Sequence, residues 1–249
     1  MGNKRVALIT GSSKGIGAAM AKELGRNGWF VYVTYNSDKK SGEEVLRDIG
    51  KSSASLTKLD VRNQKEIDEL VDTIEQEHGK LDLLVNNAAK EIPTPLEDVK
   101  FDEFKEVFES KAYGAFLMTQ KSLSLLKNGE NAMIVNVSSS LGDKPNPKFP
   151  AYCLATRFLD GLTMMQTAAY GKYGIRVNAI SPTTTYTSMW DKMGGDDPKM
   201  WESFAKNNPL GRVSTTDDVA KTLVWLISEE TGYLNGNTIY VNGGKHYKP

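Results

Sequence analysis

Cysteine and histidine are scarce in this chain of 249 residues, which contains one cysteine, Cys153, and two histidines, His78 and His246. A single cysteine excludes an internal disulfide framework, and together with so few histidines it excludes a Cys- or His-rich zinc site. The sequence therefore predicts no metal site. It also leaves little material for a catalytic triad built on histidine.

An excess of charge of one sign is also absent, because 31 lysines and arginines balance 31 aspartates and glutamates. Without a positive surplus there is no electrostatic argument for binding nucleic acid or an anionic membrane surface. Long apolar runs are missing, and the first short one, at 6–10, ends in a turn glycine, so neither a membrane span nor a signal peptide is predicted. By elimination we expect a soluble, cytoplasmic, globular protein with no nucleic-acid or membrane partner.

Short apolar runs alternate along the chain with segments of helical periodicity. Strand-like runs lie at 6–10, 29–35, 56–60, 81–86, 133–137, 175–181 and 238–241, and helical patterns lie at 15–27, 43–49, 101–126, 151–173 and 216–228, with a further helix capped by Asn63. Alternating strands and helices indicate parallel βαβ units, and the apolar strands suit a sheet covered by helices on both faces. We therefore predict an α/β fold with a doubly wound, mostly parallel, seven-stranded sheet, in which residues 1–249 form a single domain.

One segment, between Pro182 and Pro209, breaks the alternation. It contains the cluster Gly194-Gly195-Asp196-Asp197-Pro198, which is typical of a loop insertion. Ligands of open α/β sheets bind at the carboxyl ends of the strands, and the segment follows such an end. We interpret residues 183–209 as a substrate lid over the sheet in preference to a second domain.

A glycine-rich turn joins the first strand to the first helix, with the sequence Thr10-Gly11-Ser12-Ser13-Lys14-Gly15-Ile16-Gly17. Glycines let the backbone turn tightly and approach a pyrophosphate, whose charge is stabilised at the N-terminus of a helix. The strand before the turn and the helix after it are the context that a dinucleotide site requires. From this motif alone, a plain strand–helix turn with small residues remains the alternative.

Several motifs, taken in their order and spacing, resemble those of the short-chain dehydrogenase/reductase family. They are the glycine turn, Asn86-Asn87-Ala88-Ala89, Asn136-Val137-Ser138-Ser139, Tyr152 thirteen residues after Ser139, Gly174-Ile175-Arg176-Val177-Asn178 followed by Pro182 to Met189, and the terminal Gly236 to Gly244. The resemblance covers nearly the whole chain and is closest to 3-oxoacyl-[acyl carrier protein] reductases. It implies a Rossmann fold, a nicotinamide cofactor and assembly into a homo-oligomer, either a tetramer or a dimer.

The end of the second strand bears on which nicotinamide cofactor is bound. A carboxylate there would accept the ribose 2′-hydroxyl and repel a 2′-phosphate, but Tyr35 and Asn36 occupy the place, and Lys14 adds a positive charge nearby. These residues favour NADP(H) over NAD(H). The resemblance further implies contacts with the cofactor at Gly11, Ser13, Gly15, Ile16 and Gly17 in the turn, Asp60 and Val61 at the adenine, Asn87 and Ala88 at the ribose, and Pro182 and Thr187 at the nicotinamide.

The resemblance also implies that Tyr152 exchanges a proton with the substrate oxygen and that Ser139 hydrogen-bonds the same oxygen. In the family, a lysine four residues after the tyrosine lowers the pKa of the phenol, which is about 10 when free. Here Thr156 stands at that position. The family also places an asparagine three residues before a glycine on the preceding long helix, and here Lys111 stands three residues before Gly114.

The two departures suggest that the lysine has moved from the helix of Tyr152 to the neighbouring helix. We hypothesise that the ammonium of Lys111 replaces the missing cation beside Tyr152, with Thr156 supplying only a hydroxyl. A cation near the phenol favours the phenolate and brings the acid–base group toward the operating pH. The alternative is that Lys111 is an exposed or helix-packing residue and that the site is damaged.

Two functions of different classes follow from these observations. The first is an NADPH-dependent oxidoreductase that reduces a ketone or a β-ketoacyl thioester through an altered catalytic relay. The second is a cofactor-binding relative with lost or changed chemistry, such as a dehydratase, or a partner or regulatory subunit. The fold does not choose between them because function resides in the site. The distinguishing feature is whether a cation stands beside the Tyr152 hydroxyl.

Overall fold

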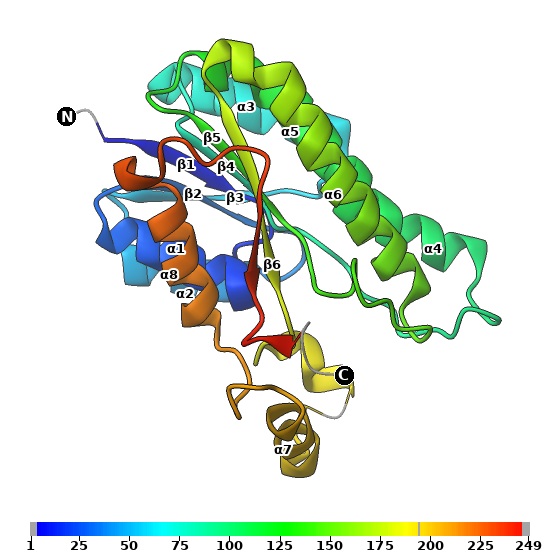
Figure 1. Ribbon diagram of the computed structural model, residues 1–249. Coiled ribbons are helices and arrows are strands. Elements are labelled where there is room, and N and C mark those ends of the chain that lie inside the picture. Colours follow the sequence, from blue (N-terminus) through cyan, green and yellow to red (C-terminus); the bar gives the residue numbers. More distant parts are fainter. Residues whose placement is uncertain (1–3, 194, 246–249) are drawn as a thin grey trace.

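The computed structural model describes residues 4–193 and 195–245, which form a seven-stranded sheet with helices on both sides (Figure 1). Every strand pairs in parallel, and the order is β3-β2-β1-β4-β5-β6-β7. The strands are β1 (Val6–Ile9), β2 (Phe30–Tyr35), β3 (Ala54–Lys58), β4 (Leu83–Asn86), β5 (Met133–Val137), β6 (Arg176–Pro182) and β7 (Thr238–Val241). This arrangement confirms the predicted doubly wound α/β fold in a single domain.

Helices cover both faces of the sheet (Figure 1). One face carries α1 (Gly15–Arg26), α2 (Lys39–Ile49) and α8 (Thr216–Leu226), and the other carries α3 (Gln64–His78), α5 (Gly114–Lys127) and α6 (Pro150–Tyr170). Two shorter helices lie outside these layers, α4 (Phe101–Phe108) against α6 and α7 (Pro198–Lys206) beyond the carboxyl end of β6. Within the described ranges, no helix combines the length and apolar character needed to cross a membrane.

The central strand β1 shows why the sequence contains continuous apolar runs. Its four residues are fully buried, with Ala7 and Ile9 in the apolar core on the α1 and α8 side and Val6 and Leu8 in the core on the α3 and α5 side. A strand covered on both faces has no polar side, so its sequence does not alternate. The chain leaves β1 in one direction and returns at β4 beside it, and the crevice at the carboxyl ends of this pair is where such sheets bind ligands.

The strand expected at 56–60 is displaced in the structure. β3 begins and ends two residues earlier, because its pairing with β2 runs from Ala54 to Lys58. β3 lies at the edge of the sheet, and most of its residues are only half-buried, so no apolar run marks its ends. Asp60 therefore lies beyond the strand, in the loop at its carboxyl end.

The helix expected at 101–126 contains a break in its hydrogen-bond pattern. α4 ends at Phe108, α5 begins at Gly114, and the residues between them, Glu109–Tyr113, form one π-helical turn. The Gly114 N–H reaches back five residues to the carbonyl of Glu109. Such turns are rare and are found frequently at functional sites. Lys111 lies in this turn and is buried.

Buried amides connect the sheet to α5 and α6. Asn86 of β4 donates to the hydroxyl of Thr119 (3.0 Å) and to Oδ1 of Asn136 on β5 (2.9 Å). Asn136 donates in turn to Thr163 (2.9 Å) and Gln166 (3.0 Å) of α6. These two asparagines belong to motifs noted in the sequence, and here they hold helices in place beneath the site.

The insertion at 183–209 consists of a 3₁₀ segment, Ser188–Met193, and α7. Trp190, Trp201 and Phe204 pack with ring centroids 5.3 to 5.9 Å apart, and Tyr186 packs 4.6 Å from Trp201. The indole N–H of Trp201 donates to the carbonyl of Gly195 (2.8 Å). The insertion therefore has a small aromatic core of its own, and its role as a lid stays a prediction.

Candidate active site

The glycine turn after β1 has no space for side chains. Gly11 and Gly15 adopt left-handed φ values of 65° and 56°, which favour glycine. A Cβ on Gly17 would lie 2.6 Å from the carbonyl oxygen of Gly11 and 2.5 Å from the side-chain nitrogen of Asn87. The backbone of the turn is therefore open to a ligand on one side and packed against the segment after β4 on the other.

Thr10 fixes the segment after β4 to this turn. Its hydroxyl accepts hydrogen bonds from the backbone N–H groups of Asn87 (2.9 Å) and Ala88 (3.0 Å). The Asn87 amide donates to the carbonyls of Thr10 (2.9 Å) and Gly11 (3.0 Å). The structure thus brings together two groups of predicted cofactor residues. The sequence alone suggested no role for Thr10, although it begins the glycine motif.

The loop after β6 reaches the same turn. A Cβ on Gly15 would lie 3.4 Å from the Thr187 methyl carbon, so Thr187 lies directly over the glycine turn. Pro182, at the end of β6, accepts a hydrogen bond from the Ser140 N–H (2.9 Å). The predicted nicotinamide-side residues therefore lie between the glycine turn and the loop that carries Ser139.

Asp60, Val61 and Asn36 gather at the end of the crevice expected to hold the adenine. Arg62 binds the Asp60 carboxylate through Nε (2.9 Å) and Nη2 (2.6 Å), and Asn36 hydrogen-bonds the same carboxylate. The hydrogen bond from Arg62 lowers the pKa of Asp60. Val61 packs against Gly114, where a Cβ would approach it to 2.7 Å. The start of α5 therefore closes the crevice on this side.

Lys14 has a partner that the sequence analysis did not identify. Its Nζ lies 2.5 Å from Oδ2 of Asp38, which also caps α2 by accepting from the Ser41 N–H (3.0 Å). The hydrogen bond from Lys14 lowers the pKa of Asp38 to about 2. The sequence alone did not identify Asp38, because the carboxylate was expected at the end of β2, where Tyr35 stands. Lys14 also lines a surface hollow of about 440 Å³ together with Lys22.

Ser139 and Tyr152 meet where the loop after β5 faces the first turn of α6. The Ser139 hydroxyl hydrogen-bonds the Tyr152 phenol and also accepts from the Leu141 N–H (3.3 Å). Burial raises the pKa of Tyr152, the nearby Glu91 carboxylate raises it further, and the hydrogen bond from Ser139 lowers it. The phenol is therefore protonated across the neutral pH range.

Lys111 lies against the face of the Tyr152 ring. Its side chain is almost completely buried, with 3% of the residue exposed. Nζ donates to the Val137 carbonyl (3.0 Å) and lies 4.7 Å from the centre of the Tyr152 ring. Burial lowers the pKa of Lys111 to about 8, while the Asp160 and Glu91 carboxylates act to raise it. The hypothesised pair is thus adjacent, with the ammonium over the ring.

Thr156, at the position of the family's lysine, is fully buried. A Cβ on Gly142 would lie 2.9 Å from its methyl carbon, so Thr156 packs under the loop after β5. In the part of the chain that the structure describes, its hydroxyl has no hydrogen-bond partner. One turn later, Asp160 accepts a hydrogen bond from the Ser138 hydroxyl (2.5 Å).

Two carboxylates, Asp160 and Glu91, act on Lys111, and neither was predicted from the sequence. Burial raises the pKa of both carboxyl groups, and Lys111 lowers both. Asp160 follows Thr156 by four residues, which is the helical spacing that could have identified it. Glu91 directly follows the Asn-Asn-Ala-Ala-Lys segment, and no spacing rule predicts that its carboxylate acts at the site.

These residues fit a dinucleotide cofactor. No side chain caps the N-terminus of α1 among the described residues, and its first turn has no acidic residue, so the free N–H groups there are available to a pyrophosphate. The left-handed glycines allow close approach, and Asn87, Ala88 and Thr187 lie against the glycines of the turn. Across residues 4–193 and 195–245, no three His, Cys, Asp or Glu side chains gather as metal ligands.

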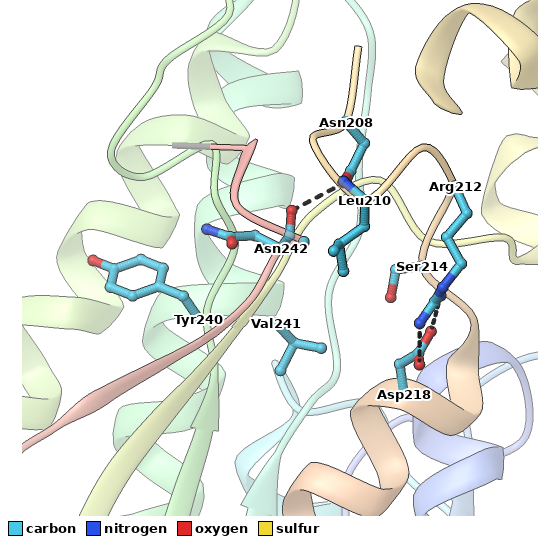
Figure 2. Close-up of a pocket in the computed structure, with 9 residues that line it drawn as sticks. Asn208, Leu210, Arg212, Ser214, Asp218, Tyr240, Val241 and Asn242 are labelled. Carbon is cyan, nitrogen blue, oxygen red and sulfur yellow. Dashed lines mark hydrogen bonds and ion pairs between the residues drawn. The ribbon is translucent and has the colours of Figure 1, made fainter. Parts of the chain in front are cut away.

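A separate hollow of about 240 Å³ lies between the end of β7 and the loop before α8 (Figure 2). Figure 2 shows Arg212 bound to Asp218 through two hydrogen bonds (2.7 and 2.9 Å) and Asn208 donating to the Asn242 carbonyl (3.1 Å). The side-chain nitrogen of Asn242, by contrast, is buried and has no hydrogen-bond partner among the described residues. None of the predicted catalytic or cofactor residues lines it.

Comparisons with known proteins cover nearly the whole chain. The family described as Enoyl-(Acyl carrier protein) reductase matches residues 11–246. The chain is 32% identical to the Uncharacterized oxidoreductase YohF of Escherichia coli (96% of this chain, 95% of that protein) and 31% identical to 3beta-hydroxysteroid dehydrogenase 1 of Eggerthella lenta (98% and 95%). It is 30% identical to the 3-oxoacyl-[acyl-carrier-protein] reductase FabG of Haemophilus influenzae (96% and 97%). The crystal structure of Cj0485 dehydrogenase superimposes with a TM-score of 0.90 at 28% identity, covering 98% of this chain and 94% of that one.

Proposed function

Because this chain is an oxidoreductase of the short-chain dehydrogenase/reductase family, we propose that it uses NADPH to reduce a ketone or a β-ketoacyl thioester through an altered catalytic relay. The observation that carries the proposal is the cluster of Ser139, Tyr152 and Lys111, which lies beside the crevice of the glycine turn. Its FabG relatives are named as 3-oxoacyl-[acyl-carrier-protein] reductases, which supports the same class of reaction.

In this mechanism, bound NADPH supplies the hydride. Ser139 donates a hydrogen bond to the substrate oxygen, and the protonated Tyr152 phenol transfers its proton to that oxygen as the alkoxide develops. The negative charge then left on Tyr152 is stabilised by the Lys111 ammonium, because a cation over an aromatic face is attracted to its electron density. Asp160 and Glu91 favour the charged form of Lys111 and so support this step.

The test is a titration followed by an assay. Quenching or enhancement of NADPH fluorescence measures cofactor binding, and loss of NADPH absorbance with a panel of ketones and β-ketoacyl thioesters measures turnover. Binding with turnover supports the reductase. The fully buried Thr156 at the lysine position favours the second candidate, a relative with lost or changed chemistry, and binding without turnover on any carbonyl would be its signature.

Lys14 is proposed to select NADPH by contacting the 2′-phosphate. Lys14→Ala is expected to raise the Kd for NADPH about tenfold and to leave that for NADH within about twofold, since a charge-assisted hydrogen bond contributes about 1.5–3 kcal/mol. Lys22→Ala is the matched control, because Lys22 lines the same hollow and also pairs with an aspartate, Asp48, but lies outside the glycine turn. An equal change for both nucleotides would mean that Lys14 does not read the phosphate.

The two directions of the reaction are expected to depend on pH in opposite ways. Reduction uses the protonated phenol, so its rate should be level at neutral pH and fall as the pH rises through about 8, where Lys111 loses its proton. Oxidation of an alcohol uses the phenolate beside the charged lysine, so its rate should rise about tenfold per pH unit below about 8 and level off above it. Stopped-flow rates in both directions measure this. Asp160→Asn should move the fall in reduction to lower pH, because Asp160 raises the pKa of Lys111.

Assembly into a homo-oligomer through α5 and α6 is part of the proposal. The outer sides of the π-helical turn, α5 and α6 expose large apolar side chains at Tyr113, Phe116, Leu154 and Phe158, with 40 to 53% of each residue exposed. Covering such a surface with a second copy would remove it from water. The cytoplasmic location expected from the sequence stays a prediction.

A further inference from the structure

The turn after β7 gives Lys245 a fixed position. Gly243 and Gly244 adopt left-handed φ values of 59° and 82°, which favour glycine. The Lys245 N–H donates to the Asn242 carbonyl (3.1 Å), and Asn208, at the end of the insertion, donates to the same carbonyl (3.1 Å, Figure 2). The turn therefore holds the backbone of Lys245 against the end of the insertion.

The ammonium of Lys245 lies between the loop after β6 and α7. Its Nζ donates to the Thr184 hydroxyl (3.3 Å) and lies 5.8 Å from the centre of the Phe204 ring, which belongs to the aromatic core of the insertion. Lys245 and Thr184 are both partly exposed. The ammonium and the hydroxyl are therefore open to a ligand that binds beneath the insertion.

Two chains of contacts join this ammonium to the loop that carries the predicted catalytic serine. Ser140 follows that serine, and its hydroxyl donates to the hydroxyl of Thr183, which directly precedes Thr184 (3.5 Å). On the other side, Lys144 donates from Nζ to the Lys245 carbonyl (3.4 Å) and from its backbone N–H to the Ser140 carbonyl (2.9 Å). Hydrogen bonds therefore place Lys245 next to the loop that is expected to bind the substrate oxygen.

No carboxylate pairs with the Lys245 ammonium in the part of the chain that the structure describes. Two acids beside the same loop have partners, because Asp143 pairs with Arg157 (2.8 Å) and Asp160 accepts from a serine hydroxyl (2.5 Å). Burial lowers the pKa of Lys245, and the charge of Lys144 lowers it further. This place between the two loops and α7 therefore presents an ammonium without a counter-ion.

The donors at this place suit a carboxylate. An ammonium attracts an anion and forms strong hydrogen bonds with it, and the neighbouring Thr184 hydroxyl can donate a second one. Two donors side by side match the two oxygens of one carboxylate. A phosphate group, with three terminal oxygens, would need a further donor.

We propose that Lys245, together with Thr184, binds the carboxylate of a keto acid whose ketone lies at Tyr152 and Ser139. The substrate class is then that of oxo carboxylic acids in which the acid group is separate from the reacting carbonyl. This inference rests on the proposed reductase function and narrows it. Lys245 acts in binding and selection, and the proton transfer stays with Tyr152.

Keto acids and their methyl esters test the proposal. Acetoacetate, levulinate and 5-oxohexanoate place the carboxylate progressively farther from the ketone, and each ester keeps the skeleton without the charge. In steady-state assays with NADPH, the native chain should show a kcat/KM at least about tenfold higher for the acid than for the ester at one of these lengths. Lys245→Met should lower kcat/KM for that acid about 10- to 100-fold, mainly through KM, and change its ester by less than about threefold.

Methionine keeps the length of the side chain and its apolar contact with Phe204, so the substitution removes mainly the charge. Lys199→Met is the matched control, because Lys199 lies on α7 of the same insertion and is exposed. It should leave the acids and the esters unchanged. Acetonylphosphonate, compared with acetoacetate, tests the anion itself, and a preference for the phosphonate would contradict a carboxylate site.

Two results would overturn the proposal. If Lys245→Met lowers kcat equally for acids and esters, Lys245 only holds the loop and the insertion in place. If the native chain prefers no acid to its ester at any length, no carboxylate is bound, whatever the variants do.

Failure of the reductase function would be recognised separately. If no ketone is reduced, calorimetric titration of the protein, with and without NADPH, still measures the affinity for each acid and its ester. Tighter binding of an acid, lost in Lys245→Met and kept in Lys199→Met, would support the carboxylate site even then. Equal binding of acids and esters would contradict it.

Discussion

Replacing Tyr152 by phenylalanine is expected to lower kcat for reduction by about 10²- to 10⁴-fold, the usual contribution of a general acid. The change removes the proton that is transferred to the substrate oxygen and the hydrogen bond with Ser139. It keeps the aromatic ring beneath the Lys111 ammonium, because phenylalanine also attracts a cation to its face. Cofactor affinity and the thermal unfolding temperature are therefore expected to remain close to those of the native chain.

Single-turnover loss of NADPH absorbance measures this effect, and the fluorescence titration confirms that the variant still binds the cofactor. Tyr170→Phe is the matched control, since Tyr170 lies on the same helix and burial also raises its pKa, but it is remote from Ser139. Only the Tyr152 variant should lose turnover. Retention of kcat within about threefold of the native value would show that Tyr152 is not the general acid.

The second large effect concerns the position of the cation. Lys111→Asn restores the family's residue on the helix before α6 but removes the ammonium from the Tyr152 ring, and we expect kcat to fall about 10²-fold. Thr156→Lys in the same chain then restores the family's lysine, one helical turn after Tyr152. If Lys111 has taken over the role of that lysine, K111N/T156K should recover at least about tenfold of the lost rate.

The rescue by Thr156→Lys distinguishes two hypotheses: that Lys111 has replaced the family's lysine, and that the active site is damaged. Thr156→Lys alone should not raise kcat in the native chain, because Lys111 already supplies the charge. In the double variant the new lysine lies four residues before Asp160, whose carboxylate can balance it. The pH profile gives a readout that packing alone would not move: among the variants at positions 111 and 156, the fall in reduction at about pH 8 should shift only in those that lack Lys111. An unchanged rate and profile in Lys111→Asn would contradict the hypothesis.

Much of the fold could be predicted from the sequence because it depends on burial. β5 and β7 have the bounds that were expected, and Asn63 caps α3 with its side chain as predicted. Continuous apolar runs identify strands that are covered on both faces. The edge strand β3 was displaced by two residues because its half-exposed side chains carry no such pattern.

The site was less completely predictable, for a physical reason. The family motifs predicted Ser139, Tyr152 and a cofactor crevice, and the spacing to Gly114 singled out Lys111; their roles stay predictions. Asp38, Glu91 and Asp160 escaped because their effects depend on which charges meet in space. No spacing in the sequence predicts that Asp38 pairs with Lys14 or that Glu91 acts on Tyr152. Their roles as partners could be recognised only from the folded chain.

The π-helical turn at Glu109–Tyr113 changes the direction in which the following side chains point, and so decides which charged group faces Tyr152. Such a turn holds one residue more than the α-helical turn it replaces, and each residue along an α-helix rotates the side-chain direction by about 100°. Deleting one residue after Lys111 would leave every side chain of the cluster in the sequence, yet it would turn the helix on one side of the break relative to the other. The site therefore depends on the number of residues in this turn as well as on their types. A chimaera of this chain with a relative is expected to keep the site only if it keeps the length of the π-helical turn.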